Sequence, residues 1–196
     1  MSKKEQGFVI WLGGIPASGK TTLAQNTVKA LEEYNIDIEI LDSEDIRNEL
    51  SPDLGFTAKD RDQNTKRLAW MAKLLSKNGI SVLIASGAVS REHRERVREY
   101  VDKYAIFYVQ CPLSVCIKRD PKGLYKKIQD GTNRQLPGCV QSVEELDTKF
   151  QRPINPELTI NTDKLSIKKC VQLIIDKLVD LQFLHILNKQ AEENKD

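Results

Sequence analysis

A chain of 196 residues is long enough to bury one sizeable core, and its length argues against two domains. Its composition, 40% hydrophobic and 30% charged, is typical of a soluble globular protein, and a net charge of +2 is too small to imply nucleic-acid or membrane binding by itself. The chain has neither an apolar run of membrane-spanning length nor the apolar segment of a signal peptide, so we expect a cytoplasmic protein.

A zinc site is not expected, because the four cysteines have no metal-like spacing and the two histidines lie far from them. Cys111 and Cys116 flank the end of an apolar strand, and we interpret them as small core residues. The others are Cys139, Cys170, His93 and His185.

A buried strand is predicted at residues 8–12, directly before a glycine-rich turn. Residues 14–21 read G-I-P-A-S-G-K-T and fit the phosphate-loop pattern G-x-x-x-x-G-K-[ST], with a helix predicted from there to about residue 34. Such a loop turns its N–H groups toward phosphate oxygens, and the helix N-terminus adds the positive end of its dipole. We expect Lys20 to reach the β- and γ-phosphates of a nucleoside triphosphate and the Thr21 hydroxyl to bind Mg²⁺. The expected contacts are Gly14, Ile15, Pro16, Ala17, Ser18, Gly19, Lys20, Thr21 and Thr22.

The next predicted elements are a strand at residues 37–41, a short helix at 44–50 and a loop at 51–56. Thr57, with Asp60 three residues later, predicts the N-terminus of a helix that runs to about residue 77. The apolar face of that helix is expected to carry Leu68, Met71, Leu74 and Leu75.

The second half predicts a strand at 80–85, a charged helix from Ser90 to about residue 103, strands at 105–109 and 158–160, and an amphipathic helix at 166–187. This alternation implies right-handed crossovers and a five-stranded parallel sheet with helices on both faces, an α/β domain over residues 1–187. A polar tail at 188–196 is expected to be frayed. Ligands bind beyond the carboxyl ends of such strands, where Asp42, Glu44, Ser86 and the phosphate loop are placed.

Residues 119–156 interrupt the alternation and are rich in Lys, Arg, Gly and Pro. A long irregular segment within a compact domain is usually functional or disordered. Basic residues at its start favour a lid that closes over phosphates, and a solvated basic surface loop is the alternative. These residues are Arg119, Lys122, Lys126 and Lys127.

The other strand ends narrow the class of phosphate-loop protein. A GTPase needs D-x-x-G and N-K-x-D, whereas residues 161–164 carry similar letters in another order. A motor-type ATPase needs an acid after its Walker-B strand, but the strand at 80–85 is followed by Ser86. Acids follow the second strand instead, at Asp42 and Glu44. This placement favours a small-molecule kinase, in which a carboxylate faces the acceptor hydroxyl and helps to hold Mg²⁺.

Four segments resemble the adenylyl-sulfate (APS) kinases, a family of P-loop kinases. Residues 41–47 resemble L-D-G-D-N-V-R, and residues 53–64 resemble D-L-G-F-S followed by D-R and N. Residues 119–127 match R-D-P-K-G-L-Y-K-K without a mismatch, and residues 153–158 are similar to P-x-N-P-E-L. The match is collinear from residue 8 to about residue 180.

The resemblance implies the P-loop kinase fold and transfer of phosphate from ATP to the 3′-hydroxyl of adenosine 5′-phosphosulfate (APS), giving PAPS. It also implies that Lys20, Asp42 and Glu44 are catalytic, that Thr21 and Asp42 hold Mg²⁺, and that Arg119 and Thr162 contact ATP. The implied acceptor-binding residues are Asp42, Arg47, Phe56, Arg61, Asn64, Lys122, Gly123, Leu124 and Phe150. Dimers are frequent in the family, so a homodimer is an expectation.

Within this set, Arg47 and Arg61 would bind the phosphosulfate group, and Phe56 and Phe150 would stack on the adenine of the acceptor. From the residues alone, Phe56 fits a loop anchor packed into the core equally well. Arg61 likewise fits an ordinary charge on a helix surface.

Departures from the family pattern cluster on the acceptor side. Ser43, Glu44 and Asp45 replace the family's Gly, Asp and Asn. Residues 87–91 read G-A-V-S-R where the family has I-S-P-Y-R, so that Ala88 stands at the position of the family's serine. The chain is also longer than the usual family form between residues 138 and 147. Two alternatives to an APS kinase therefore stay open. One is a kinase for another nucleotide-like acceptor, such as a nucleoside diphosphoramidate, and the other is a nucleotide-binding regulatory protein without catalysis.

Overall fold

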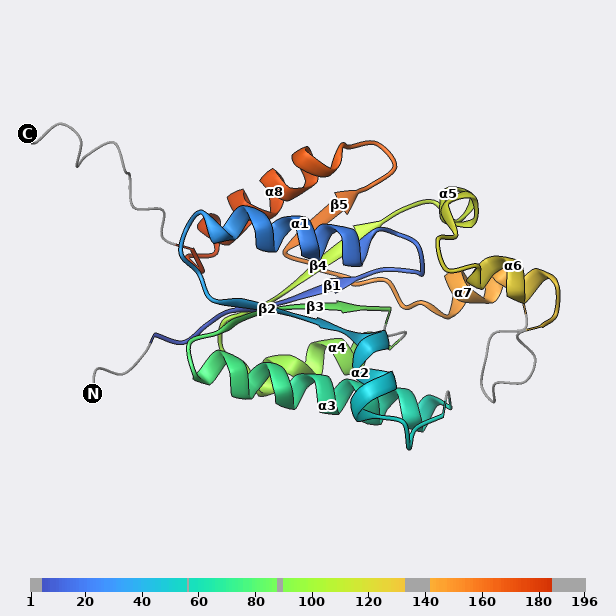
Figure 1. Ribbon diagram of the computed structural model, residues 1–196, viewed down its shortest axis with the longest axis horizontal. Coiled ribbons are helices and arrows are strands. Elements are labelled where there is room, and N and C mark those ends of the chain that lie inside the picture. The colour runs from blue at the N-terminus through green and yellow to red at the C-terminus, as the bar shows by residue number, and fades with distance from the viewer. Residues whose placement is uncertain (1–4, 56, 88–89, 133–141, 185–196) are drawn as a thin grey trace, which may run out of the picture.

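The computed structural model describes residues 5–55, 57–87, 90–132 and 142–184. Its five strands form one parallel sheet in the order β2-β3-β1-β4-β5 (Figure 1). They are β1 (Val9–Gly13), β2 (Ile38–Asp42), β3 (Ser81–Ser86), β4 (Tyr104–Gln110) and β5 (Leu158–Asn161). Each strand begins and ends within one residue of its predicted position. The α/β class and the five-stranded parallel sheet are therefore confirmed.

Helices cover both faces of the sheet. They are α1 (Lys20–Glu32), α2 (Ser43–Leu50), α3 (Ala58–Lys77), α4 (Arg91–Glu95), α5 (Leu113–Arg119), α6 (Leu124–Gln129), α7 (Val143–Lys149) and α8 (Ile167–Asp180). α1 and α8 pack side by side on one face, and α3 and α4 lie on the other (Figure 1). None of the helices in the described ranges is long and apolar enough to cross a membrane.

The central strand β1 is buried along its whole length, which explains its unbroken apolar sequence. Successive side chains of a strand point to opposite faces of the sheet. Ile10 and Leu12 accordingly join the core beneath α1 and α8, whereas Val9 and Trp11 join the core beneath α3. β1 thus ties the two halves of the core together and fixes the position of the turn that follows it.

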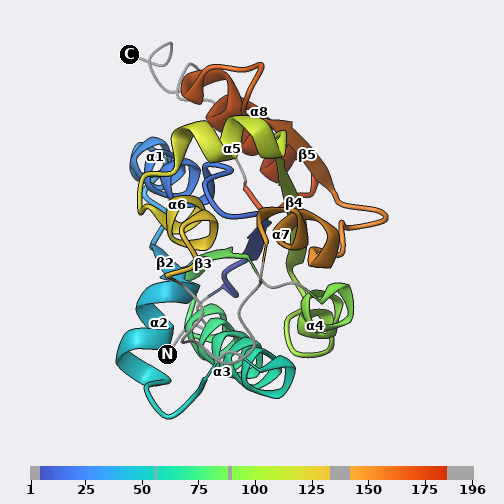
Figure 2. The ribbon, with the colours of Figure 1, turned by 90° about the vertical axis from the view of Figure 1, so that its right-hand side faces the viewer.

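The carboxyl ends of the strands lie at one edge of the sheet. β1 ends at Gly13, level with Ser86 at the end of β3, and Asp42 at the end of β2 lies one residue earlier in the register. Figure 2 views the molecule from this side, where α2, α5, α6 and α7 lie around the strand ends. The predicted edge for ligand binding is therefore surrounded by short helices.

The N-terminus of α3 is formed as predicted. The Thr57 hydroxyl oxygen accepts a hydrogen bond from the Asp60 backbone N–H at 3.2 Å, and the Asp60 carboxylate accepts one from the Thr57 N–H at 3.2 Å. These reciprocal bonds satisfy two N–H groups that a helix start leaves unpaired.

Two predictions of secondary structure in the second half of the sequence were wrong. The helix expected from Ser90 to residue 103 ends at Glu95 and continues as a 3₁₀ helix, Arg96–Glu99, because the chain tightens there to turn into β4. The segment 119–156 is not irregular throughout, since it contains α6 and α7. The Asp120 carboxylate accepts hydrogen bonds from two N–H groups at the start of α6, a cap that the pattern did not reveal.

The apolar face predicted for α3 is partly wrong. Leu68 is fully buried, and Met71 and Leu75 are partly buried against the same core, but Leu74 is 55% exposed. The closing helix α8 ends at Asp180, earlier than predicted, and residues 185–187 and the tail 188–196 lie outside the described residues. Cys111 and Cys116 are buried, which confirms them as core residues, and Cys139 and His185 lie outside the described residues.

The contrast between two leucines of α3 tests this placement. Leu68→Ala should reduce the free energy of unfolding by about 2–5 kcal/mol, since it leaves a cavity beside β1 and β3. Leu74→Ala, the matched control, should change it by less than about 0.5 kcal/mol because the side chain lies in water. Urea unfolding of both variants measures these values, and equal losses would contradict the burial described here.

Candidate active site

The turn between β1 and α1 is a closely packed backbone loop. A β-carbon at Gly14 would lie 2.5 Å from the Val109 carbonyl oxygen and 2.7 Å from the Ser18 hydroxyl, so this position excludes a side chain. Gly19, at the N-cap of α1, has a φ of 102°, in the left-handed region that favours glycine. The loop therefore has the geometry that the phosphate-loop pattern predicts, and the N-terminus of α1 opens into it.

Lys20 folds back over this loop. Its ammonium group donates hydrogen bonds to the carbonyl oxygens of Gly14, at 2.9 Å, and Ile15, at 2.8 Å. Burial of the ammonium lowers the pKa of Lys20 to about 8, and the negative charge of Asp42 only partly offsets this effect. The site thus holds a desolvated cation that an anionic ligand would stabilise.

Thr21 and Asp42 are brought together, although they lie on different elements. The Thr21 hydroxyl donates to the Asp42 carboxylate at 2.7 Å, and the second oxygen of that carboxylate accepts from the Glu44 N–H at 2.9 Å. Hydroxyl and carboxylate oxygens suit Mg²⁺, which is bound through one or two protein groups together with phosphates and water. This donor set fits the predicted metal pair. No cluster of three or more His, Cys, Asp or Glu in the described ranges could hold a metal by itself.

Glu44 lies in the first turn of α2, two residues after Asp42. Its carboxylate accepts a hydrogen bond from the ammonium group of Lys122, and this contact raises the pKa of Lys122. Lys122 lies in the turn between α5 and α6, just before Gly123 and Leu124, so the pair joins the second predicted acid to the predicted lid.

The predicted acceptor side carries a second concentration of positive charge. Arg47 donates to the Gly55 carbonyl at 2.6 Å, and burial together with the nearby Arg61 lowers the pKa of Arg47. The Asn64 side chain is 4% exposed, and its amide oxygen has no hydrogen-bond partner within the described residues. Adjacent guanidinium groups and an unsatisfied amide oxygen suit a ligand that is both anionic and a hydrogen-bond donor. Phe56, predicted to stack on a base here, lies outside the described residues.

Phe150 is only 3% exposed. Its ring stacks on Tyr108, with 6.1 Å between centroids and 18° between planes, and the guanidinium carbon of Arg94 lies 4.9 Å from the ring centroid. Little of the ring surface is open to solvent in this arrangement. A role for Phe150 in stacking on a base stays a prediction.

Thr162 connects the predicted lid to the phosphate loop. Arg119, at the end of α5, donates to the Thr162 hydroxyl at 3.2 Å and to its carbonyl at 2.7 Å. The Thr162 hydroxyl in turn donates to the Ser18 carbonyl at 2.7 Å. Two predicted donor-site residues from distant parts of the sequence therefore lie against the loop, while Thr22 is exposed in the first turn of α1.

Sequence analysis missed the contact that fixes α6. Tyr125 is fully buried, and its hydroxyl donates to the Pro16 carbonyl in the phosphate loop at 2.9 Å. Burial raises the pKa of Tyr125 well above its usual range, so the hydroxyl stays a donor. Tyr125 lies within the matched R-D-P-K-G-L-Y-K-K segment, but nothing in its spacing indicates which group it contacts.

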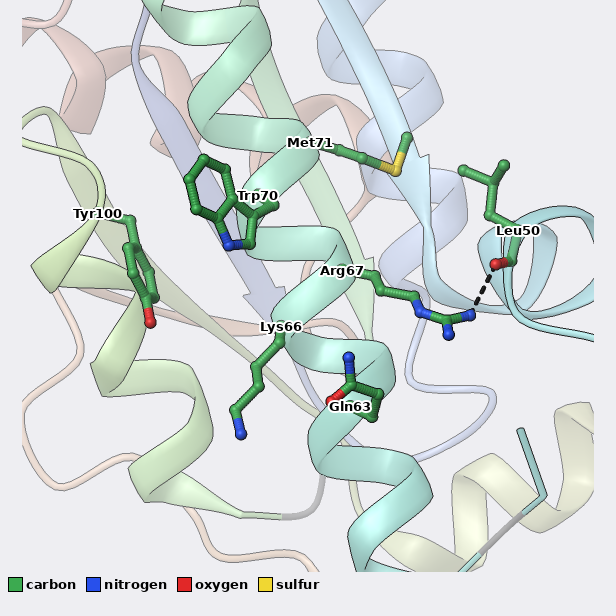
Figure 3. Close-up of a pocket in the computed structure, with 7 residues that line it drawn as sticks. All are labelled: Leu50, Gln63, Lys66, Arg67, Trp70, Met71 and Tyr100. Atoms are coloured by element: carbon green, nitrogen blue, oxygen red, sulfur yellow. Dashed lines mark hydrogen bonds between the residues drawn. The ribbon is translucent and has the colours of Figure 1, made fainter. Parts of the chain in front are cut away.

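A separate hollow of about 390 Å³ lies on the outer surface of α3, away from the phosphate loop (Figure 3). Trp70 and Tyr100 line it with rings at 6.2 Å, and Arg67 closes one end by donating to the Leu50 carbonyl at 2.8 Å. The hollow contains none of the predicted site residues.

Comparison with known proteins gives one consistent result. The family model for adenylylsulphate kinase matches residues 6–161. An adenylyl-sulfate kinase of Rippkaea orientalis is 36% identical over 181 residues, covering 92% of this chain and 96% of the relative. A probable adenylyl-sulfate kinase of Archaeoglobus fulgidus is 40% identical over 157 residues, covering 80% of this chain and 97% of the relative.

Solved structures agree with the sequence comparisons. The APS kinase CysC of Mycobacterium tuberculosis, in complex with AMPPNP and APS, superposes with a TM-score of 0.80 at 33% identity. The superposition covers 89% of this chain and 99% of the other. The similarity therefore extends over nearly the whole of both chains.

The desolvated ammonium of Lys20 predicts a pH-dependent stability. Its pKa in the folded protein, about 8, lies below its ordinary value of 10.5, so between these values the unfolded chain binds more protons. The contribution of Lys20 to the free energy of unfolding should rise with pH across this window. Urea unfolding at pH 7.5 and at about pH 10 should show wild type gaining stability relative to Lys20→Met. A constant difference between the two proteins would contradict the lowered pKa.

Proposed function

The chain belongs to the adenylyl-sulfate kinase family, and on that premise we propose that it transfers the γ-phosphate of ATP to the 3′-hydroxyl of APS, giving PAPS. The main support for the proposal is the match over almost the full length of relatives named adenylyl-sulfate kinase. In addition, the phosphate loop and the predicted catalytic side chains lie at one edge of the sheet. The chemistry of each part follows from the contacts described above.

On the donor side, the N–H groups of the loop and the N-terminus of α1 would bind the phosphates of ATP. Lys20 would leave its two carbonyl partners to contact the β- and γ-phosphates, where a full positive charge is favoured. Phosphate binding would therefore raise the pKa of Lys20 from about 8 and keep it protonated. The backbone of the loop already has the predicted geometry, so only the Lys20 side chain has to move.

Thr21 and Asp42 would hold Mg²⁺ together with phosphate oxygens. Bound there, the ion neutralises charge that develops on the transferred phosphoryl group. The chain itself supplies the position: the N–H of Glu44 and the Thr21 hydroxyl fix both oxygens of Asp42. A preoriented carboxylate of this kind needs no reorganisation during the reaction.

On the acceptor side, Arg47 and Arg61 would bind the phosphosulfate, and Asn64 would accept a hydrogen bond from the acceptor. Glu44 would orient the 3′-hydroxyl and take up its proton, which requires its carboxylate to exchange Lys122 for the hydroxyl. Lys122 would then be available to the anionic groups of the substrates. This exchange is feasible because the two side chains are 55% and 62% exposed, and exposed ion pairs are weak.

Arg119 and Thr162 would contact the donor nucleotide, while Gly123 and Leu124 bring the start of α6 to the acceptor. The segment 119–156 would act as the lid, anchored by Tyr125 on the loop that holds ATP. A homodimer stays a prediction from the family.

A coupled ATP-consumption assay over a panel of acceptors tests the proposal. We expect turnover with APS that depends on Mg²⁺ and gives PAPS, identified by mass. Turnover with a nucleoside diphosphoramidate but not with APS would reject APS as the acceptor. Tight ATP binding with no turnover on any acceptor would instead favour the regulatory alternative.

Substitution of Lys20 tests the role of the loop. Lys20→Ala should lower kcat by a factor of about 10²–10³, because it removes a cation placed where transition-state charge develops. Lys29→Ala, in the last turn of the same helix and exposed to solvent, is the matched control and should leave turnover unchanged. Near-normal activity of Lys20→Ala would overturn the assignment.

A further inference from the structure

Arg94 is a fully buried arginine in α4 with no role assigned so far. Arg94 is 0% exposed, and this burial lowers the pKa of Arg94 to about 10. A buried guanidinium is costly unless it is well paired, so its contacts indicate what it does in the structure.

Those contacts converge on the segment of residues 150–152, between α7 and β5. The Arg94 guanidinium lies over the Phe150 ring at 4.9 Å and donates a hydrogen bond to the Gln151 carbonyl. From the same helix, the Arg91 N–H donates to the Gln151 side-chain oxygen at 2.9 Å, and the Arg91 guanidinium donates to the Arg152 carbonyl at 3.0 Å. α4 therefore fixes three successive residues of this segment.

The same arginine is anchored to the sheet. The Tyr104 hydroxyl, from β4, donates to the Arg94 carbonyl at 2.8 Å. A β-carbon built on Gly13 would lie 3.7 Å from Cδ of Arg94, so the side chain runs past the end of β1, next to the phosphate loop. Arg94 thus spans the distance between the rigid sheet edge and Phe150.

The charged and titratable groups that face Arg94 are Tyr104, Arg91, Glu95 and Tyr108. Tyr108 also stacks on Phe150, so the ring is held jointly by β4 and α4. A cation over an aromatic face is a directional contact that grows stronger when water is excluded. Loss of the guanidinium would leave the position of Phe150 to packing alone.

We propose that Arg94 is a positioning residue that places Phe150, and through it the base of the acceptor nucleotide, without touching either substrate. The inference rests on the proposed function and on the family resemblance, which implies that Phe150 contacts the acceptor. It predicts that Arg94 affects the acceptor and not the donor, although its side chain runs past Gly13, the residue before the phosphate loop.

Arg94→Met keeps the length of the side chain but removes its charge and its donors. It should raise the KM for APS by about tenfold while the KM for ATP stays within about twofold. Arg94→Lys retains a cation but not the planar fork, so its KM for APS should fall between wild type and Arg94→Met. An unchanged KM for APS, or an equal rise in both KM values, would overturn the proposal.

Arg98→Met is the matched control. Arg98 also places a guanidinium over an aromatic ring, 5.1 Å from the centroid of Tyr104. Its hydrogen bonds go to Glu95, Glu157 and the Tyr104 carbonyl, at the start of β4, whereas Phe150 packs on Tyr108 further along that strand. It should leave the KM for APS unchanged at a similar thermal stability. A double-mutant cycle with Phe150→Leu adds a second criterion: the effect of Arg94→Met should largely vanish in that background, and full additivity would contradict action through Phe150.

Amide hydrogen exchange separates failure of this inference from failure of the proposed function. In Arg94→Lys, the Arg91 N–H, which donates to the Gln151 side-chain oxygen, should exchange at least about tenfold faster than in wild type, while β1 and α1 keep their protection. Unchanged exchange would overturn the positioning role whatever the acceptor is. If wild type does not turn over APS but the Arg91 N–H loses protection in the variant, the proposed function fails and the positioning role stands. The same measurement decides the matter if Arg94→Met does not fold.

Discussion

The sharp turn from β1 into α1 is the constraint on which the rest of this structure depends. With β4 in register beside β1, the Val109 carbonyl lies so close to Gly14 that only glycine fits at the start of the loop. Lys20 and Thr21 then have fixed positions, because they are the first two residues of α1, whose N-cap is Gly19. Sheet register, loop closure and the two side chains are therefore a single geometric unit.

Two neighbouring segments are attached to this unit by hydrogen bonds to its carbonyl groups. Thr162 binds the Ser18 carbonyl from the end of β5, and Tyr125 binds the Pro16 carbonyl from α6. A phosphate loop directs its N–H groups toward the ligand, which leaves carbonyls on the outer side in need of donors. Tyr125 belongs to the predicted lid, and Thr162 accepts hydrogen bonds from Arg119 at the start of that lid, so the contacts that satisfy the loop also hold the lid segment against it.

Much of this arrangement could be predicted from the sequence, and the limits have physical causes. The buried strands could be placed to within one residue because both faces are covered, and Thr57 with Asp60 predicted a capped helix start correctly. Leu74 was misplaced because helical periodicity alone does not determine where the covering layer ends. Tyr125 and Arg94 were missed because each acts on a group more than 50 positions away, which no local pattern encodes.

The two acids at the end of β2 and the start of α2 are held in different ways. Asp42 is held by the backbone of α2 and by Thr21, both fixed by the loop. Glu44, with a longer side chain than the family's aspartate, instead takes its position from Lys122 in the segment that leads into α6. In the structure the second carboxylate is therefore held by a side chain of the predicted lid, and under the proposed function it would release Lys122 when it orients the acceptor hydroxyl. Because this ion pair is exposed, an anionic substrate would replace it at little cost, whereas Asp42 would keep both of its partners.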